Sequence, residues 1–333
     1  MATRNLTADE IQSCLTGCCQ VRKTAEGLMP LRFHEGALDY YGVNDTFRPR
    51  ATCPAGITLT LRTNSPWIEI DVATSTGSRD YGYADLWSNG RFTGTLGISE
   101  NGGTIAGRMD TAWTSPGDPQ ERALTLYLPH SRTTVIRSVS VAEGASLSHA
   151  PSRPVLLAFG DSITQGMDSR HPSLTYIATA ARRCGMALHN GAVGGHYFDA
   201  TSLPEAPAAG PEIIVVAYGV NDWAGGRPVE AAEPFLARVR ELYPEVPALV
   251  LSPLWHKRGD TSDAPADWML LSDYRARLIT IVNSFHKMTA VDGISLLPPH
   301  SGLLPDGLHP DSAGHIVCGE TLAREIRDSE DGK

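Results

Sequence analysis

Two short polar segments, far apart in the chain, carry the residue types of a nucleophile and its base. Ser162 stands in the segment Gly160-Asp-Ser-Ile-Thr-Gln-Gly166, directly after an apolar run typical of a buried strand. A serine on such a turn can present its hydroxyl to a cleft, but it needs a base to remove its proton. Asp306 and His309 are close enough in sequence for the carboxylate to orient the imidazole. Together the segments predict Ser-His-Asp chemistry, although each one alone is at least as compatible with an ordinary turn.

Two further loops follow predicted strands and offer the hydrogen-bond donors that such chemistry requires. Their sequences are Asn190-Gly-Ala-Val-Gly-Gly-His196 and Gly219-Val-Asn-Asp222. Attack on an ester carbonyl creates an oxyanion, which needs preorganised donors about 3 Å away. A glycine N–H, the amide of Asn221 and the N–H of Ser162 itself are suitable donors. In a parallel sheet, the loops at the carboxyl ends of the strands lie at one edge, where these donors would meet.

In chain order, the four segments resemble the conserved blocks of the SGNH/GDSL hydrolases, a family named for its Ser, Gly, Asn and His. The resemblance spans about 155–327. It implies a catalytic triad and an oxyanion hole to which Ser162 also contributes its N–H. It also implies a flavodoxin-like, three-layer domain with a parallel sheet. The residues concerned are Ser162, Asp306 and His309 for the triad, and Gly195 and Asn221 for the hole.

The sequence departs from the family pattern at His196, where members often carry Asp or a small polar residue. This difference leaves open whether Gly194 or Gly195 supplies the glycine donor. Asp161 and Asp222 flank the predicted site, and we interpret them as hydrogen-bonding supports of the loops.

Aromatic residues close after predicted strands are candidates for substrate binding. Trp223, Trp255 and Phe198 could line an apolar acyl pocket, although simple packing is the more common role for each of them. Trp67 and Trp87 could be sugar platforms, but tryptophans in alternating strands belong more often to the core.

The elements that must position the four loops are strands alternating with amphipathic helices over 155–330. Such alternation indicates a parallel sheet covered on both faces. Helical spacing connects Leu174 to Cys184, Val229 to Val239, Tyr274 to Phe285 and Ile316 to Ile326. The expected strands are Val155–Phe159, Ala187–Asn190, Glu212–Tyr218, Ala248–Leu251 and Thr289–Asp292.

The first part of the chain is predicted to be an all-β sandwich or jelly-roll domain within 1–145, with 146–154 as a linker. Residues 31–143 are predicted to be an all-β unit, because they contain short alternating runs, and Asn89-Gly90 between two of these runs predicts a hairpin turn. Thr7 and Glu10 form a capping-box pattern for a short helix. The arrangement resembles carbohydrate esterase family 2, in which a jelly-roll-like domain precedes the SGNH domain.

Composition limits the classes of partner. The chain has 333 residues and a net charge of −9, which argues against nucleic acid or anionic membranes as partners. The six cysteines form no CxxC pair, and no HExxH segment is present. Because these are typical patterns of metal ligands, the sequence predicts neither a metal site nor a cofactor. The amino-terminal residues lack the layout of a secretory signal, so the sequence predicts a cytoplasmic location.

These observations predict a serine esterase acting on an ester or thioester of a small molecule. The alternative is an acyltransferase that passes the acyl group to a hydroxyl of a natural-product or sugar acceptor. A non-enzymatic alternative is a carbohydrate-binding protein on a decayed SGNH scaffold. Decay would remove triad or oxyanion-hole residues first, and none of them is missing from the sequence.

Overall fold

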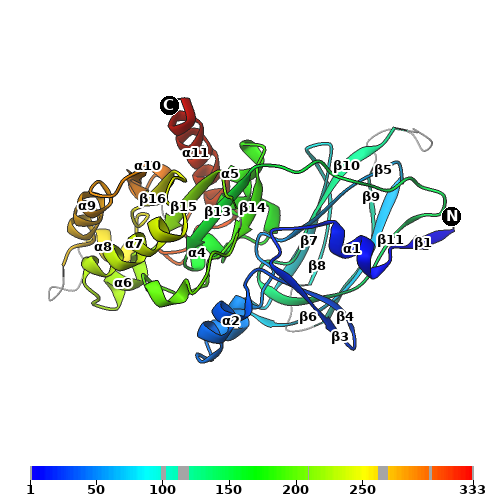
Figure 1. Ribbon diagram of the computed structural model, residues 1–333, viewed down its shortest axis with the longest axis horizontal. Coiled ribbons are helices and arrows are strands. Elements are labelled where there is room, and N and C mark those ends of the chain that lie inside the picture. Colours follow the sequence, from blue (N-terminus) through cyan, green and yellow to red (C-terminus); the bar gives the residue numbers. More distant parts are fainter. Residues whose placement is uncertain are drawn as a thin grey trace.

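The computed structural model describes residues 2–98, 103–111, 120–208, 210–261, 269–299 and 302–331. Its first half contains two antiparallel sheets, and its second half contains one parallel sheet (Figure 1). One antiparallel sheet runs β3-β4-β11-β6-β9, with β1 paired to β11, and comprises β1 (Thr3–Asn5), β3 (Gln20–Thr24), β4 (Gly27–Leu31), β6 (Trp67–Gly77), β9 (Gly103–Asp110) and β11 (Arg132–Ala142). The other runs β12-β5-β10-β7-β8, with β2 paired to β5, and comprises β2 (Leu15–Thr16), β5 (Thr58–Thr63), β7 (Gly82–Ser88), β8 (Arg91–Ile98), β10 (Arg122–Tyr127) and β12 (Ser148–His149).

The two antiparallel sheets pack into a sandwich because their strands alternate apolar and polar side chains. Leu59 and Leu61 of β5 share one buried cluster with Ile68 and Ile70 of β6, which lies in the other sheet. The predicted hairpin joins β7 and β8, and Asn89 takes the left-handed conformation that its turn requires. The expected all-β sandwich is therefore confirmed.

Three helices accompany the sandwich: α1 (Ala8–Ser13), α2 (Glu35–Gly42) and α3 (Phe47–Ala51). The predicted capping box at Thr7 is complete at the start of α1. Helices α2 and α3 correct the expectation that 31–143 is all-β. This segment leaves the sandwich and packs against the second domain, where Tyr41 and Val193 share a buried cluster.

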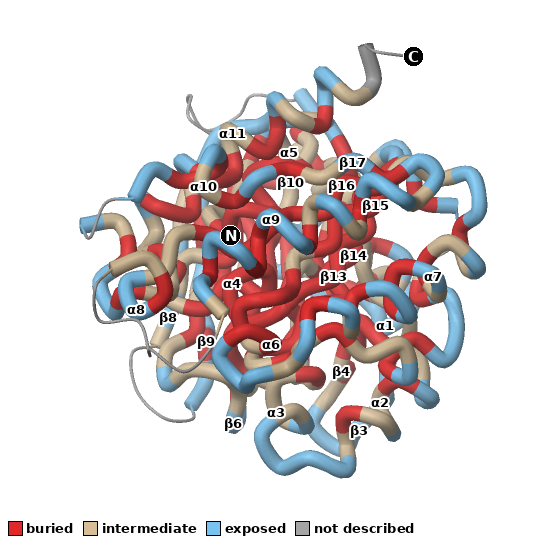
Figure 2. Tube along the Cα trace, turned by 90° about the vertical axis from the view of Figure 1, so that its left-hand side faces the viewer, coloured by how far each residue is buried: buried red, intermediate tan, exposed pale blue. Residues whose placement is uncertain are grey.

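The parallel sheet has the strand order β14-β13-β15-β16-β17, which is the flavodoxin-like order. The nearly continuous burial of its strands follows from coverage on both faces. Figure 2 shows β13, β14 and β16 in the buried interior, with exposed helix surfaces around them. The strands are β13 (Val155–Gly160), β14 (Ala187–Asn190), β15 (Ile213–Ala217), β16 (Ala248–Leu251) and β17 (Met288–Val291).

Helices cover both faces of this sheet, as the sequence predicted. Leu156 of β13 packs with α5 and α11 on one face, whereas Leu157 packs with α7 and α9 on the other. The helices are α4 (Ser162–Gln165), α5 (Tyr176–Arg183), α6 (Val220–Ala224), α7 (Ala232–Leu242), α8 (Lys257–Asp260), α9 (Leu271–Val282), α10 (Gly293–Leu296) and α11 (Ser312–Asp331), with short 3-10 turns η1 (Pro172–Leu174), η2 (Ala200–Ser202) and η3 (Val229–Ala231). Among the described residues, no helix is long and apolar enough to cross a membrane.

The sandwich lies against β14, the edge strand of the parallel sheet. Gly17 and Gly56 both have positive φ, and a Cβ atom at Gly17 would lie 2.3 Å from the carbonyl oxygen of Leu188. Glycine is therefore needed at Gly17 for both its conformation and the close approach. Tyr127 of β10 belongs to the buried cluster of the second domain. Within the predicted linker, β12 still pairs with β5 of the sandwich.

Arg32 connects the two domains through backbone carbonyl groups. Its side chain is fully buried, and its Nη1 donates to the carbonyl oxygens of Asn190 and Ala192 at 2.6 and 2.7 Å. The other nitrogens donate to Cys53 and Arg50 within the first domain. Burial lowers the pKa of Arg32 to about 10. The guanidinium thus fixes the chain that leaves β14 to the segment that carries α3.

Candidate active site

The nucleophile loop follows β13 directly. Ser162 begins α4 and is 6% exposed, and the side chain of Asp161 caps this short helix by accepting a hydrogen bond from the Ile163 N–H at 3.0 Å. A Cβ atom at Gly160 would lie 2.3 Å from Thr164 Oγ1, so this tight turn requires glycine. The strand end and the cap together place the serine at the carboxyl edge of the sheet, as the sequence predicted.

The structure brings Ser162, His309 and Asp306 into one hydrogen-bonded chain. His309 Nε2 lies 2.8 Å from Ser162 Oγ, and His309 Nδ1 lies 2.7 Å from Asp306 Oδ2. The second oxygen of Asp306 accepts the backbone N–H groups of Leu308 and His309. Burial acts to raise the pKa of Asp306, but the hydrogen bond from His309 and these N–H groups outweigh it and lower the pKa. A charged carboxylate therefore faces the imidazole, which is the arrangement that a general base requires.

The hydrogen bonds of the loop after β14 distinguish Gly194 from Gly195 as candidate donors to the oxyanion. The Gly194 N–H donates to Gln165 Oε1 at 2.7 Å, whereas the Gly195 N–H has no partner among the described residues. Gly195 has φ +78, a conformation that favours glycine. Asn221 donates one amide hydrogen to the His196 carbonyl at 2.9 Å and retains a second one. These contacts favour Gly195 over Gly194 as the donor.

His196, the residue at which the sequence departs from the family pattern, lies in an aromatic cluster built by both domains. Its Nε2 lies 3.1 Å from the hydroxyl of Tyr40, which donates to Asp199 at 2.8 Å. The rings of Phe47 and Tyr197 also contact it. Burial lowers the pKa of His196 to about 4, so the ring is neutral near pH 7. It therefore supports the loop as an uncharged aromatic residue.

The two acids that flank the site are buried supports. Asp222 accepts hydrogen bonds from Arg227 Nε at 3.1 Å and from the Phe198 N–H at 3.3 Å. Burial raises the pKa of Asp161 to about 7 and that of Asp222 to about 6. Asp161 accepts a backbone N–H of the nucleophile segment, and Asp222 accepts a backbone N–H and an arginine side chain. Both contacts agree with our interpretation of the sequence.

The three aromatic candidates for substrate binding lie in different environments. Phe198 and Trp223 are 1% and 3% exposed, and Trp223 Nε1 donates to the Met269 carbonyl. Both are packing residues in this structure, since each sits in the buried cluster beneath α7 and α9. Trp255 is partly exposed and is the one of the three that retains a free surface.

Sequence reasoning missed three residues beside the site. Arg50 of α3 donates to the Gly194 carbonyl at 2.8 Å. Arg79, from the loop between β6 and β7, forms an ion pair with Asp168, which itself lies close to His309. No sequence pattern connects Arg50 or Arg79 with the four blocks, because the docking of the domains brings them there. Asp168 had one signal, its place only six residues after Ser162.

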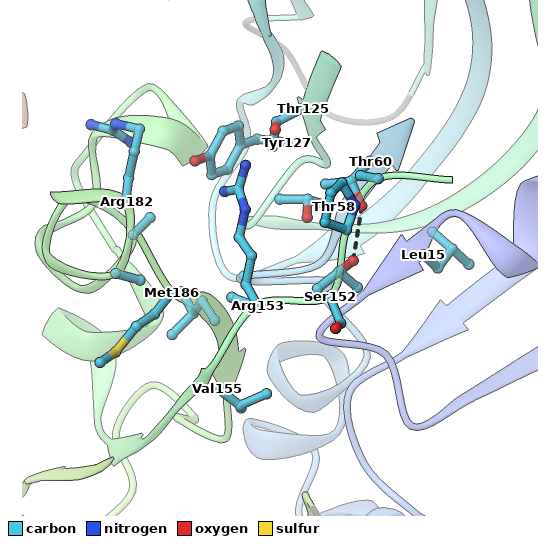
Figure 3. Close-up of a pocket in the computed structure, with 18 of the residues that line it drawn as sticks. Leu15, Thr58, Thr60, Thr125, Tyr127, Ser152, Arg153, Val155, Arg182 and Met186 are labelled. Atoms are coloured by element: carbon cyan, nitrogen blue, oxygen red, sulfur yellow. Dashed lines mark hydrogen bonds between the residues drawn. The ribbon is translucent and has the colours of Figure 1, made fainter. Parts of the chain in front are cut away.

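A cavity of about 250 Å³ lies between the domains, but not at the predicted site (Figure 3). Thr60 and Tyr127 of the sandwich line one side, and Arg153 of the linker and Met186 of the second domain line another (Figure 3). Arg153 precedes β13 and Met186 precedes β14, so the cavity lies at the amino ends of the strands. Ser162 lies at the opposite, carboxyl end of β13.

Comparison with known proteins agrees with this architecture. Residues 158–317 match the family model described as the GDSL-like Lipase/Acylhydrolase family. A search of curated proteins found no match.

Among solved structures, the salicylyl-acyltransferase SsfX3 from a tetracycline biosynthetic pathway is similar, with TM-score 0.80 and 21% identity over 94% of both chains. An acetyl xylan esterase from Butyrivibrio proteoclasticus has TM-score 0.60 and 15% identity, over 99% of this chain and 100% of that one. A family two carbohydrate esterase from Cellvibrio japonicus has TM-score 0.62 and 15% identity, over 99% and 98%. These likenesses confirm the predicted two-domain fold.

Proposed function

Because the chain carries a GDSL-like lipase/acylhydrolase domain, we propose that it is a serine esterase that hydrolyses an ester or thioester of a small molecule. The observation that carries this proposal is the continuous contact from Ser162 Oγ through His309 to Asp306, at 2.8 and 2.7 Å. Both distances lie within hydrogen-bond range, so the imidazole can accept the serine proton without rearrangement.

The reaction proceeds through an acyl-enzyme. His309 Nε2 takes the proton of Ser162 as Oγ attacks the carbonyl carbon, and the carbonyl oxygen becomes an oxyanion. The N–H groups of Ser162 and Gly195 and the amide of Asn221 stabilise that charge. His309 then gives its proton to the departing alcohol or thiol, and the ester bond breaks. In the second half, His309 takes a proton from water as the water oxygen attacks the acyl carbon. The acyl–Oγ bond then breaks, His309 returns the proton to Ser162 Oγ, and the acid is released.

Acyl transfer is the second candidate, and a specific likeness favours it. The salicylyl-acyltransferase shares the two-domain fold over 94% of both chains. If a hydroxyl of an acceptor replaces water in the second half, the same residues complete a transfer. A domain that holds an acceptor beside the acyl-enzyme would let the acceptor compete with water through effective concentration.

The non-enzymatic alternative is less well supported. A decayed site would have lost the contact between nucleophile and base, whereas Ser162, His309 and Asp306 remain in hydrogen-bonding contact.

Two measurements test the proposal. A serine-reactive phosphonate should add to Ser162, and p-nitrophenyl esters of increasing acyl length should be turned over. Absence of both labelling and turnover would refute the enzymatic function. Product partition separates the two enzymatic candidates: an activated acyl donor is supplied with hydroxyl acceptors, and free acid is measured against acylated acceptor. Free acid as the sole product at saturating acceptor supports the esterase.

A further inference from the structure

The turn that follows the nucleophile helix carries a second carboxylate next to the base. Asp168 lies in this turn after α4, six residues beyond Ser162, and has φ +72, in the left-handed region. Its backbone N–H donates to the Tyr81 hydroxyl of the first domain at 3.0 Å. Left-handed backbone at a residue other than glycine persists where its surroundings hold it, and here a contact from another domain does so.

Asp168 and Asp306 face the same nitrogen of His309. Asp168 Oδ2 lies 3.5 Å from His309 Nδ1, compared with 2.7 Å for Asp306 Oδ2. The side chain of Asp168 is 31% exposed, whereas that of Asp306 is 48% exposed. The closer carboxylate makes the hydrogen bond, and the farther one is better shielded from water. A charge shielded from water acts more strongly on a neighbouring imidazolium.

Arg79 accounts for the orientation of Asp168. Its Nε lies 2.6 Å from Asp168 Oδ1, which leaves Oδ2 turned toward His309. Arg79 Nη1 also donates to the Ser78 carbonyl at 2.9 Å. Asp168, Asp306 and His309 are close enough together to resemble a metal-binding cluster. In this structure the guanidinium of Arg79 supplies the positive charge that a metal ion would bring beside Asp168.

From these contacts we propose that Asp168 is a second carboxylate partner of His309 and that Arg79 of the first domain holds it in place. This assignment rests on the proposed function, since it concerns the same base. When His309 accepts the proton of Ser162, both carboxylates stabilise the imidazolium, and no proton moves to either of them. Asp168 and Arg79 are positioning residues, because they act through His309. The first domain therefore takes part in the chemistry through Arg79.

A double-mutant cycle tests the proposal. With Asp168 present, Asp306→Asn should lower kcat by only about 10–10²-fold, less than the ~10⁴ found where one acid acts alone. Asp168→Asn should cost less than about tenfold, and asparagine tolerates the left-handed backbone. If either carboxylate can support His309, the double variant should approach ~10⁴-fold, more than the product of the single losses. KM should stay unchanged throughout, because the substrate contacts are intact.

Arg79 provides a second and independent variant. In the Asp306→Asn background, Arg79→Gln should lower kcat further, whereas in the parent its effect should be small. Arg79→Lys should restore part of the loss, since it keeps the charge. The matched control is Arg108→Gln, which removes an exposed ion pair with Glu69 on β6 and β9. It should leave kcat unchanged in both backgrounds.

The outcomes separate the assignment from the function on which it rests. If the loss in the double variant equals the product of the single losses, the carboxylates act independently and the proposal is wrong. The same conclusion holds if Arg79→Gln costs equally in both backgrounds. If Ser162 of the parent is not labelled by the phosphonate and no p-nitrophenyl ester is turned over, the proposed function itself fails.

Discussion

The two domains contribute to one site in different ways. The second domain supplies Ser162, Gly195 and Asn221 from the segments that follow parallel strands, two of which are short helices. The first domain reaches the same edge with Arg79 from a loop between strands and with Arg50 from a helix outside its sandwich. The chemistry of the site thus belongs to one domain and much of its support to the other. Substitutions at the site in the second domain should therefore change mainly kcat, whereas substitution of Arg32 in the first domain should change mainly the free energy of unfolding.

The largest effect on turnover is expected from substitution of the nucleophile, Ser162. Ser162→Ala should reduce turnover by about 10⁶-fold, as found where a triad acts as a unit. Thermal stability should change little, because the hydroxyl contacts only His309 among the described residues. Turnover of a p-nitrophenyl ester and phosphonate labelling measure the effect. Ser284→Ala, at an exposed position of the same domain, is the control. Labelling at a serine other than Ser162 would contradict the assignment.

The second largest effect on kcat is expected from loss of a donor to the oxyanion. Asn221→Ala should lower kcat by about 10²–10³-fold, since its free amide hydrogen acts on charge that develops in the transition state. KM should change little. Steady-state kinetics measure the effect, and the control is Asn283→Ala, which changes an exposed asparagine of the same domain. An increase in KM at constant kcat would make Asn221 a substrate-binding residue instead.

A first-domain substitution should act mainly on stability. Arg32→Met leaves carbonyl groups of both domains without their donor and should lower the free energy of unfolding by about 3 kcal/mol. Arg22→Met removes an exposed arginine paired with Glu35 and should cost about 1 kcal/mol or less. Urea unfolding of the two variants compares them. Equal losses would mean that Arg32 does not connect the domains as described.

The last effect is a dependence of stability on pH. Burial lowers the pKa of His196 to about 4, from about 6.5 in the unfolded chain. Between these values the unfolded state binds more protons, so this contribution is complete above pH 6.5 and is lost as the pH falls toward 4.

The aromatic surroundings of His196 allow a substitution that removes this titration. His196→Phe should reduce the slope of unfolding free energy near pH 5 by about 1.4 kcal/mol per pH unit. His149→Gln, at an exposed position, should keep the parent slope. Thermal or urea unfolding between pH 4.5 and 7.5 gives the slopes. An unchanged slope in the Phe variant would show that His196 is already charged in the folded protein.

The sequence predicted those parts of the molecule whose signals are local. The strands of the parallel sheet begin and end within two residues of the expected positions, because a strand buried on both faces is a short apolar run. Asn89-Gly90 specified its hairpin through its backbone preferences alone. The four blocks could be recognised for the same reason: each lies on one loop, and its residue types follow from the chemistry of that loop.

What the sequence could not predict depends on contacts between distant segments. The residues of α2 and α3 carry no pattern that separates them from the sandwich, since their partners, such as Val193, belong to the other domain. Arg79 and Arg32 look like ordinary surface cations until the domains dock. The burial of Trp223 and Phe198 also depended on the helices that cover them.

The carbonyl contacts of Arg32 have a consequence for the way the chain folds. Arg32 and Asn190 are 158 residues apart, and loop closure over such a length costs entropy before any contact forms. On the ribosome, the sandwich emerges first and can fold while the parallel sheet is still being made. The strand that ends at Asn190 then meets a guanidinium that is already in place. We therefore expect the sandwich to act as a template on which the later domain docks.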